Sequence, residues 1–216
     1  MVGLAEHQSH ILAVAVAVAA EPPNHADVPV FRRVDYTPEA IALRYQDYAA
    51  ADTTAGFVSA YRGILSAGGE RAFAPILRHL ARDEPTPCLV HCTAGKDRTG
   101  LVCAIVLSLC GVDDDTIAWE YGLTEEGLAP LKEGIMQRLM SAEGVTVDEA
   151  GAWRMLSSRP ESMLATLQVM REEYGSVEEY VVNECRLSPD EIERLRRNFI
   201  VEPQNGGVLD AERAVL

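Results

Sequence analysis

The sequence predicts one α/β domain that is rich in helix and contains few strands. Three observations lead to this prediction. Residues 11–20 alternate between Val and Ala over most of their length, which is the period of a strand. Residues 88–91 form a short apolar run that an apolar helix follows. The C-terminal half carries repeated helix-capping patterns.

The first 31 residues are expected to hold one strand and one loop. A strand fits residues 11–20 better than a secretory signal does, because residues 1–10 contain Glu6 and no Lys or Arg. Three prolines between residues 21 and 29 predict a loop, and residues 30–31 are read as the end of a short strand.

Helix signals begin at residue 37. Thr37 can cap a helix that starts at Pro38. Apolar side chains then recur at helical spacing in two segments, and Gly68-Gly69 ends the first of them. The apolar positions are Phe57, Tyr61, Ile64 and Leu65 in the first segment, and Phe73, Ile76, Leu77 and Leu80 in the second.

The middle of the chain reads as strand, loop and helix. Residues 88–91 predict a short buried strand, and residues 101–110 are apolar on every side. Such a helix is normally buried in the middle of a domain. Beyond it, Ser-x-x-Glu patterns predict the starts of three amphipathic helices near Ser158, Ser176 and Ser188.

Charge and cysteine content narrow the range of functions. The chain has 19 basic and 33 acidic residues, a formal charge of −14, which disfavours nucleic acid and anionic membranes as partners. Five cysteines without C-x-x-C spacing predict neither a metal site nor a disulfide framework. A reducing, cytoplasmic compartment is the simpler expectation, with no cofactor and no stable membrane insertion.

The junction between strand and helix reads HCTAGKDRTG over residues 91–100. A loop that closes onto a helix N-terminus directs backbone N–H groups inward, and the helix dipole favours an anion there. Gly95 lets the backbone approach a ligand without a Cβ. The pattern predicts a phosphate cradle made of Thr93, Ala94, Gly95, Lys96, Asp97 and Arg98.

Two side chains of this loop carry the predicted chemistry. Arg98 lies six residues after Cys92, and its planar guanidinium can hold two phosphate oxygens. The same donors favour a thiolate at Cys92, which can attack phosphorus and form a phosphocysteine. Thr99 offers a hydroxyl to the sulfur, and His91 is expected to orient the loop rather than to act as a base.

These residues resemble the His-Cys-x-x-Gly-x-x-Arg-Thr-Gly signature of protein tyrosine and dual-specificity phosphatases. The whole loop is similar to that of the atypical phosphatases of the bacterial and fungal PtpB type. The resemblance covers about residues 28–192, and it includes the segments VPVF at 28–31, GVDD at 111–114, YGLT at 121–124 and YGSVEEY at 174–180.

The resemblance implies a cysteine-phosphatase-like α/β fold: a parallel sheet flanked by helices, with a helix-rich C-terminal half. The site is expected at the carboxyl end of a central strand. The resemblance also implies metal-free hydrolysis of phosphotyrosine, with phosphoserine, phosphothreonine and phosphoinositides as further substrates.

Family roles carry over to four residues of the loop. Cys92 would be the nucleophile, Arg98 the phosphate clamp, Lys96 an extra cation suited to phosphoinositides, and Asp97 the general acid. Asp97 has an equal alternative, which is to order the loop by pairing with Lys96 or Arg98. An acid from another loop stays open at Asp35, Asp47 or Asp52, and Asp113-Asp114-Asp115 are expected to cap the next helix.

The N-terminus departs from the family pattern. Members begin with a strand-rich segment that carries an Asn-x-Arg-Asp-type motif, which residues 1–27 do not match. The N-terminal strands of the sheet are therefore expected to be incomplete. The expected organisation is a divergent segment at 1–27, a phosphatase domain at 28–201 and a tail at 202–216.

Two classes of function fit this reading. The first is a phosphatase whose partner is a phosphorylated protein or a phosphoinositide, with phosphotyrosine ahead because of the acidic surface. The second is a catalytically impaired scaffold that only binds phosphate, which the unmatched N-terminus keeps open. A redox role for Cys88 and Cys92 would require their Cα atoms to lie within about 7 Å.

Overall fold

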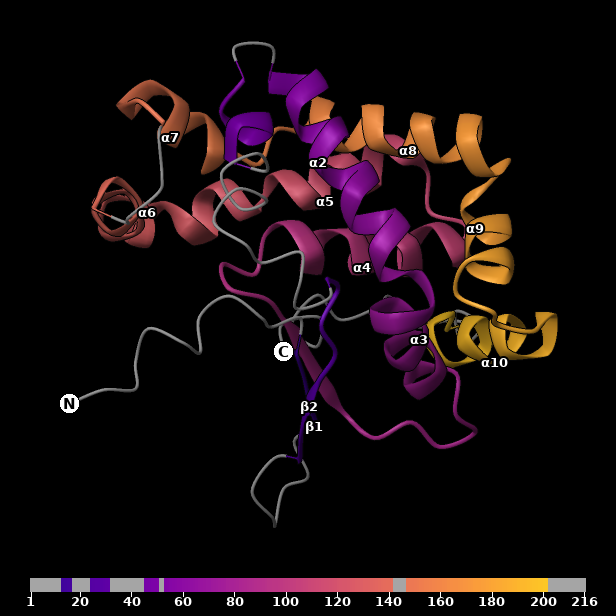
Figure 1. Cartoon of the computed structure of the whole chain (residues 1–216). Coiled ribbons are helices and arrows are strands. Elements are labelled where there is room, and N and C mark those ends of the chain that lie inside the picture. The colour runs from indigo at the N-terminus through magenta and orange to yellow at the C-terminus, as the bar shows by residue number, and fades with distance from the viewer. Residues whose placement is uncertain (1–12, 17–23, 32–44, 51–52, 142–146, 202–216) are drawn as a thin grey trace, which may run out of the picture.

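Figure 1 shows the computed structural model, which describes residues 13–16, 24–31, 45–50, 53–141 and 147–201. Helices make up the body of the molecule, and the strands extend from one side of it (Figure 1). Within the described residues, no helix combines the length and apolar character needed to cross a bilayer.

Three short strands form one antiparallel sheet. They are β1 (Ala13–Val16), β2 (Asn24–Asp27) and β3 (Cys88–His91), in the order β2-β1-β3. Val14 of β1 lies opposite Ala26 on one side and Val90 on the other. The predicted α/β fold with a parallel sheet flanked by helices is therefore wrong, and β3 is an edge strand of the described sheet rather than a central one.

Connection length explains part of this difference. A parallel pair needs a crossover of about a dozen residues or more, whereas residues 17–23 alone join β1 to β2. β1 lies inside the predicted strand at 11–20, and β3 has the bounds predicted for the strand at 88–91. The expectation that this strand is buried is wrong, because β3 lies at the edge of the described sheet and Leu89 is 62% exposed. β2 occupies residues that were expected to form a loop, because pairing with β1 overrides weak local strand propensity.

Three helical segments follow one another without a break after residue 52. They are α2 (Thr53–Gly68), the π-helical turn η2 (Gly69–Phe73) and α3 (Ala74–Leu80). The α-helical stretch ends at Gly68 as predicted, but the helical path continues, and Ala74 N donates to the carbonyl of Gly69. A Cβ on Gly69 would lie 2.7 Å from the carbonyl oxygen of Glu184, so glycine permits this close approach. The predicted helix start at Thr37 lies outside the described residues.

The helix α4 (Asp97–Leu109) lies in the middle of the helical body, which confirms the prediction from its apolar pattern (Figure 1). Around it pack α5 (Asp114–Gly122) and α9 (Val177–Asn183), and α8 (Pro160–Tyr174) packs on α2 and α5. The apolar side chains of α4 are buried in the main core; they are Leu101, Val102, Ala104, Ile105, Val106 and Leu109.

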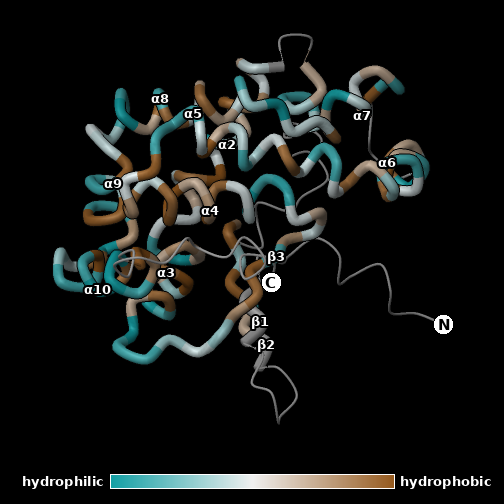
Figure 2. Tube along the Cα trace, turned by 180° about the vertical axis from the view of Figure 1, so that it is seen from behind, coloured by the Kyte–Doolittle hydropathy of each residue, from teal (hydrophilic) through white to brown (hydrophobic). Residues whose placement is uncertain are grey.

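Two further helices form a separate unit at one end of the body (Figure 1). These are α6 (Thr124–Met140) and α7 (Glu149–Met155). They share a small apolar cluster of their own, with Met136, Ala152 and Leu156 buried at its centre. In Figure 2 apolar colour concentrates where the helices of the main body face one another, and it is sparser along α6 and α7.

Helix starts show which of the predicted caps form. Asp113 caps α5 as predicted, because its carboxylate accepts a hydrogen bond of 2.9 Å from Thr116 N. Ser176 accepts from Glu179 N at the start of α9, also as predicted. The pattern at Ser158 forms no cap, since α8 begins at Pro160 and Arg159 occupies the capping position without a side-chain bond.

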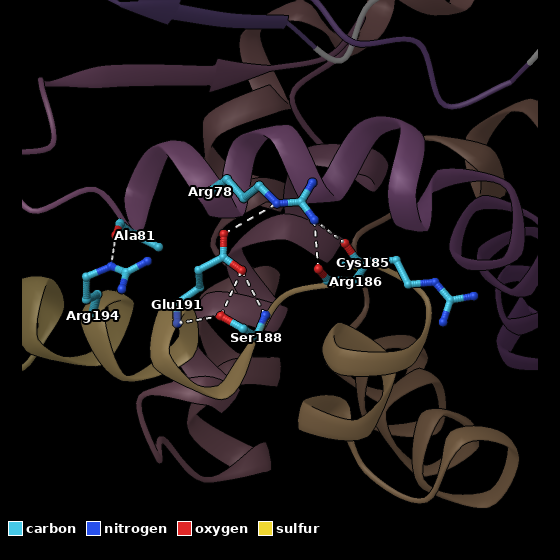
Figure 3. A network of polar contacts seen from close by, with 7 residues as sticks. All are labelled: Arg78, Ala81, Cys185, Arg186, Ser188, Glu191 and Arg194. Carbon is cyan, nitrogen blue, oxygen red and sulfur yellow. Dashed lines mark hydrogen bonds and ion pairs between the residues drawn. The ribbon is translucent and has the colours of Figure 1, made fainter.

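The last helix, α10 (Pro189–Phe199), opens with the predicted capping box. Ser188 Oγ accepts from Glu191 N, and the Glu191 carboxylate accepts from Ser188 N at 2.8 Å. Figure 3 shows that Arg78 of α3 connects this box to the preceding loop. Its Nη2 donates to the carbonyl of Arg186 at 2.7 Å, and its Nε lies 3.5 Å from Glu191 Oε1.

Replacing Ser188 by Ala is expected to lower the free energy of unfolding by about 1 kcal/mol, because the N-terminus of α10 loses a side-chain acceptor. For a chain of this length, thermal denaturation followed by circular dichroism should show a fall of about 2–4 °C in Tm. Ser188→Asn keeps an acceptor and is the matched control. Equal losses in the two variants would show that the cap contributes nothing.

Candidate active site

Residues 92–96 connect β3 to α4 and contain the predicted nucleophile and the first four residues of the predicted cradle, whose last two, Asp97 and Arg98, begin α4. Cys92 follows the last residue of β3 and is buried, with 7% of its surface exposed. Gly95 has a φ of +68°, in the left-handed region that favours glycine. A Cβ there would meet nothing within 4 Å, so the backbone angle rather than lack of space requires glycine.

The loop closes onto the N-terminus of α4. Gly100 N donates to the carbonyl of Lys96 at 2.9 Å, which is the first hydrogen bond of this helix. N–H groups in the first turn of a helix have no partner within the helix, and the helix dipole adds partial positive charge there. Cys92 therefore lies beside a place suited to an anion.

Arg98 spans the outer side of the loop. Its Nη2 donates to Thr93 Oγ1 at 3.1 Å, which joins the two ends of the predicted cradle. Thr93 and Gly95 are exposed, while Ala94 and Arg98 are half-buried. A guanidinium in this place can turn two parallel donors toward a phosphate bound in the loop.

Lys96 points into the protein rather than toward the loop opening. Its side chain is 2% exposed, and its Nζ donates to Asp97 Oδ1 at 2.6 Å. The ammonium also lies 4.6 Å from the ring centre of Phe57 and 5.6 Å from that of Tyr48. Carboxylate and ring faces together compensate the loss of water around this charge.

Two buried tyrosines form a hydrogen-bonded chain that ends at Asp97. Tyr61 of α2 donates from its hydroxyl to Asp97 Oδ1 at 2.9 Å. The hydroxyl of Tyr121, from α5, lies 2.7 Å from that of Tyr61. Gly100 makes room for this arrangement, because a Cβ there would lie 2.9 Å from the Tyr121 ring.

Sequence reasoning placed Tyr61 among the apolar positions of a helix and gave Tyr121 no role in the site. Both side chains are buried, with 0% and 2% of their surface exposed, as the helical pattern indicates for Tyr61. A third aromatic residue, Tyr48, packs edge-on against Phe57 and Tyr61. The sequence carried no signal that the hydroxyl groups of Tyr61 and Tyr121 would meet.

The two supporting residues are close to the loop. His91 Nδ1 lies 3.3 Å from the carbonyl oxygen of Cys92, a position consistent with orienting the loop. Thr99 Oγ1 is buried and has no hydrogen-bond partner among the described residues. A buried hydroxyl without a hydrogen-bond partner costs free energy of folding, and a catalytic role is one reason for a protein to keep such a group.

The other cysteines do not share this environment. Burial raises the pKa of Cys103 to about 11 and that of Cys185 to about 12. Cys88 starts β3 and Cys92 follows its end, so the strand rise places their Cα atoms about 13 Å apart. A disulfide between them is excluded in this fold. Among the described residues, no three His, Cys, Asp or Glu side chains gather as a metal site.

The structure describes one of the three alternative acids. Asp35 and Asp52 lie outside the described residues, and Asp47 belongs to the helical turn at residues 45–49. Within the described part of the chain, Asp97 is the acidic residue whose carboxylate forms a hydrogen bond with a side chain of the loop, that of Lys96.

Curated proteins with similar sequences are phosphatases. The triple specificity protein phosphatase PtpB of Mycobacterium tuberculosis is 34% identical over 137 residues, which are 60% of this chain and 49% of that protein. A tyrosine-protein phosphatase of Nostoc commune is 27% identical over 129 residues, 57% of this chain and 42% of that protein. The chain thus spans half the length or less of these relatives.

A family model agrees with these pairwise similarities and covers more of the chain. The model described as the tyrosine phosphatase family matches residues 5–201, a range that includes the whole loop and every described helix. The chain therefore belongs to the tyrosine phosphatase family.

Proposed function

We propose that this chain hydrolyses phosphate monoesters without a metal ion, through a phosphocysteine intermediate at Cys92, with phosphotyrosine in proteins as the preferred substrate. One observation carries the proposal. Cys92 lies in a closed loop at the N-terminus of α4, and Arg98 reaches across that loop to Thr93. Membership of a phosphatase family supports it.

In the first step the Cys92 thiolate attacks phosphorus. The S–P bond forms while the bond from phosphorus to the tyrosine oxygen breaks. Arg98 and the N–H groups at the start of α4 hold the three other phosphate oxygens as their charge grows. Asp97 gives its proton to the departing phenolate, which leaves as neutral tyrosine.

In the second step water attacks the phosphocysteine. Asp97, now a carboxylate, takes a proton from the water while the new P–O bond forms and the S–P bond breaks. The products are inorganic phosphate and the Cys92 thiolate. The buried hydroxyl of Thr99, which has no partner among the described residues, would then donate to the departing sulfur.

The direction of Lys96 supports a protein substrate over a phosphoinositide. A cation that read a second phosphate would have to face the loop opening, whereas the Lys96 ammonium is buried and bound to Asp97. The formal charge of −14 also disfavours approach to an anionic membrane. Phosphoserine, phosphothreonine and phosphoinositides remain secondary substrates in the proposal.

Replacing Cys92 by Ser should lower turnover of p-nitrophenyl phosphate and of a phosphotyrosine peptide by about a thousandfold or more, because the nucleophile is lost. Wild-type turnover should be unchanged in EDTA. Cys88→Ser, which alters a thiol four residues away in β3, is the matched control and should stay active. A folded wild-type chain without turnover would point to a scaffold that only binds phosphate.

Lys96→Ala should reduce kcat/KM for a phosphotyrosine peptide and for a phosphoinositide by similar factors. The expected reason is that Lys96 acts through Asp97 on both reactions rather than by contacting a head group. Steady-state assays of both substrates, with the Tm of each protein as a check on folding, give the comparison. A selective loss of phosphoinositide turnover would mean that Lys96 reads a second phosphate.

A further inference from the structure

The hydroxyl groups of Tyr121 and Tyr61 and the carboxylate of Asp97 form a chain of hydrogen bonds beneath the active-site loop. We propose that Tyr61, supported by Tyr121, is a positioning residue that fixes the Asp97 carboxyl group so that its Oδ2 atom delivers the proton to the leaving oxygen. This inference rests on the phosphatase function proposed above and assigns a residue to its acid step.

The two oxygens of Asp97 have different surroundings. Oδ1 accepts a hydrogen bond from Tyr61 and another from the Lys96 ammonium, at 2.9 and 2.6 Å. An oxygen that accepts from a phenol and an ammonium is a poor place for a proton. The acid form of Asp97 therefore carries its proton on Oδ2, which has no hydrogen-bond partner among the described residues.

Exposure points the same way. The Asp97 side chain is 22% exposed, whereas Lys96 is 2% exposed and Tyr61 is fully buried. Both donors thus approach the carboxyl group from the interior, and its partly exposed side has no hydrogen-bond partner among the described residues. Proton transfer from Oδ2 would end with a carboxylate whose Oδ1 is already bound by two donors, so no new partner has to be found in that step.

The direction of the hydrogen bonds follows from the number of hydrogens available. Tyr61 has one hydroxyl hydrogen and gives it to Asp97, so Tyr121 must donate to Tyr61. Burial raises the pKa of Tyr61 well above its usual value, and the charge of Asp97 raises it further. Burial and Asp97 also raise the pKa of Tyr121, so both phenols remain protonated donors at neutral pH.

Rigid elements hold this chain in place. Tyr61 comes from α2, where its ring packs edge-on against that of Phe57, with the ring centres 5.8 Å apart. Tyr121 comes from α5 and lies against Gly100 in the first turn of α4. Three helices thus fix one carboxyl group, and this matters because small displacements of a reacting group can cost about a hundredfold in rate.

The test is the dependence of kcat/KM on the leaving group in Tyr61→Phe, which keeps the ring and removes the hydroxyl. An aryl phosphate with a weakly acidic phenol, such as phenyl phosphate, needs protonation in the transition state, whereas p-nitrophenyl phosphate needs it far less. We expect a loss of about tenfold on phenyl phosphate and of less than about threefold on p-nitrophenyl phosphate, within the range of general acid catalysis. Asp97→Asn should show the same dependence, more strongly.

Tyr180→Phe is the matched control. Tyr180 is also fully buried, and its hydroxyl donates to the carbonyl of Leu65 at 2.8 Å, outside the loop. This variant should lose stability without any change in the ratio of the two kcat/KM values. If Tyr61→Phe does not fold, Tyr121→Phe provides the test of the positioning role. Loss of the Tyr121 hydroxyl should change the ratio of the two kcat/KM values in the same direction by a smaller factor.

The outcomes separate this inference from the proposed function. Equal losses of kcat/KM on both substrates in the folded Tyr61→Phe variant would overturn the positioning role. So would a similar change in the ratio of the two kcat/KM values in Tyr180→Phe. In either case Cys92→Ser would still be inactive, and the proposed function would stand. Activity that survives Cys92→Ser would instead overturn the proposed function itself.

Discussion

The buried ammonium of Lys96 is the constraint on which the candidate active-site loop depends. Taking an ion out of water costs several kcal/mol, and a carboxylate with good geometry is needed to offset it. Asp97 Oδ1 accepts from the ammonium at 2.6 Å, most strongly as a carboxylate and still as an acid, and the ring centres of Phe57 and Tyr48 lie 4.6 and 5.6 Å from it. The loop cannot turn Lys96 outward without leaving Asp97 and these rings, so loop, α4 and α2 hold one another in place.

This pair also connects the loop to the core. Lys96 precedes α4 and Asp97 is its first residue, so their interaction lies where the helix begins. The following turns bury Leu101 and Ile105 almost completely. Because the position of α4 is set by that packing, the place of Arg98 relative to Cys92 follows from the core rather than from the loop alone.

The backbone path of the candidate active-site loop could be predicted because its residues are contiguous, and the geometry of a strand, a glycine turn and a helix start is local. Tyr61 and Tyr121 are 60 residues apart, and in each helix a tyrosine packs as a phenylalanine would, so their contact exists only in the folded chain. The inward direction of Lys96 likewise depends on a contact that exists only in the folded chain, that of its ammonium with the ring of Phe57. The parallel sheet was expected from family resemblance, whereas the pairing of β1 with β2 and β3 sets the observed direction.

The separate apolar cluster shared by α6 and α7 has a consequence for local stability. Three residues form its buried centre, whereas the main core extends through most of the other helices. Among its links to the body are polar contacts, such as Arg154 Nε donating to the carbonyl of Ala49 at 2.8 Å. Regions with few buried apolar contacts open at lower free energy than the whole domain. Amide hydrogens of α6 and α7 should therefore exchange with solvent through local opening, while those of α4 should exchange only through global unfolding.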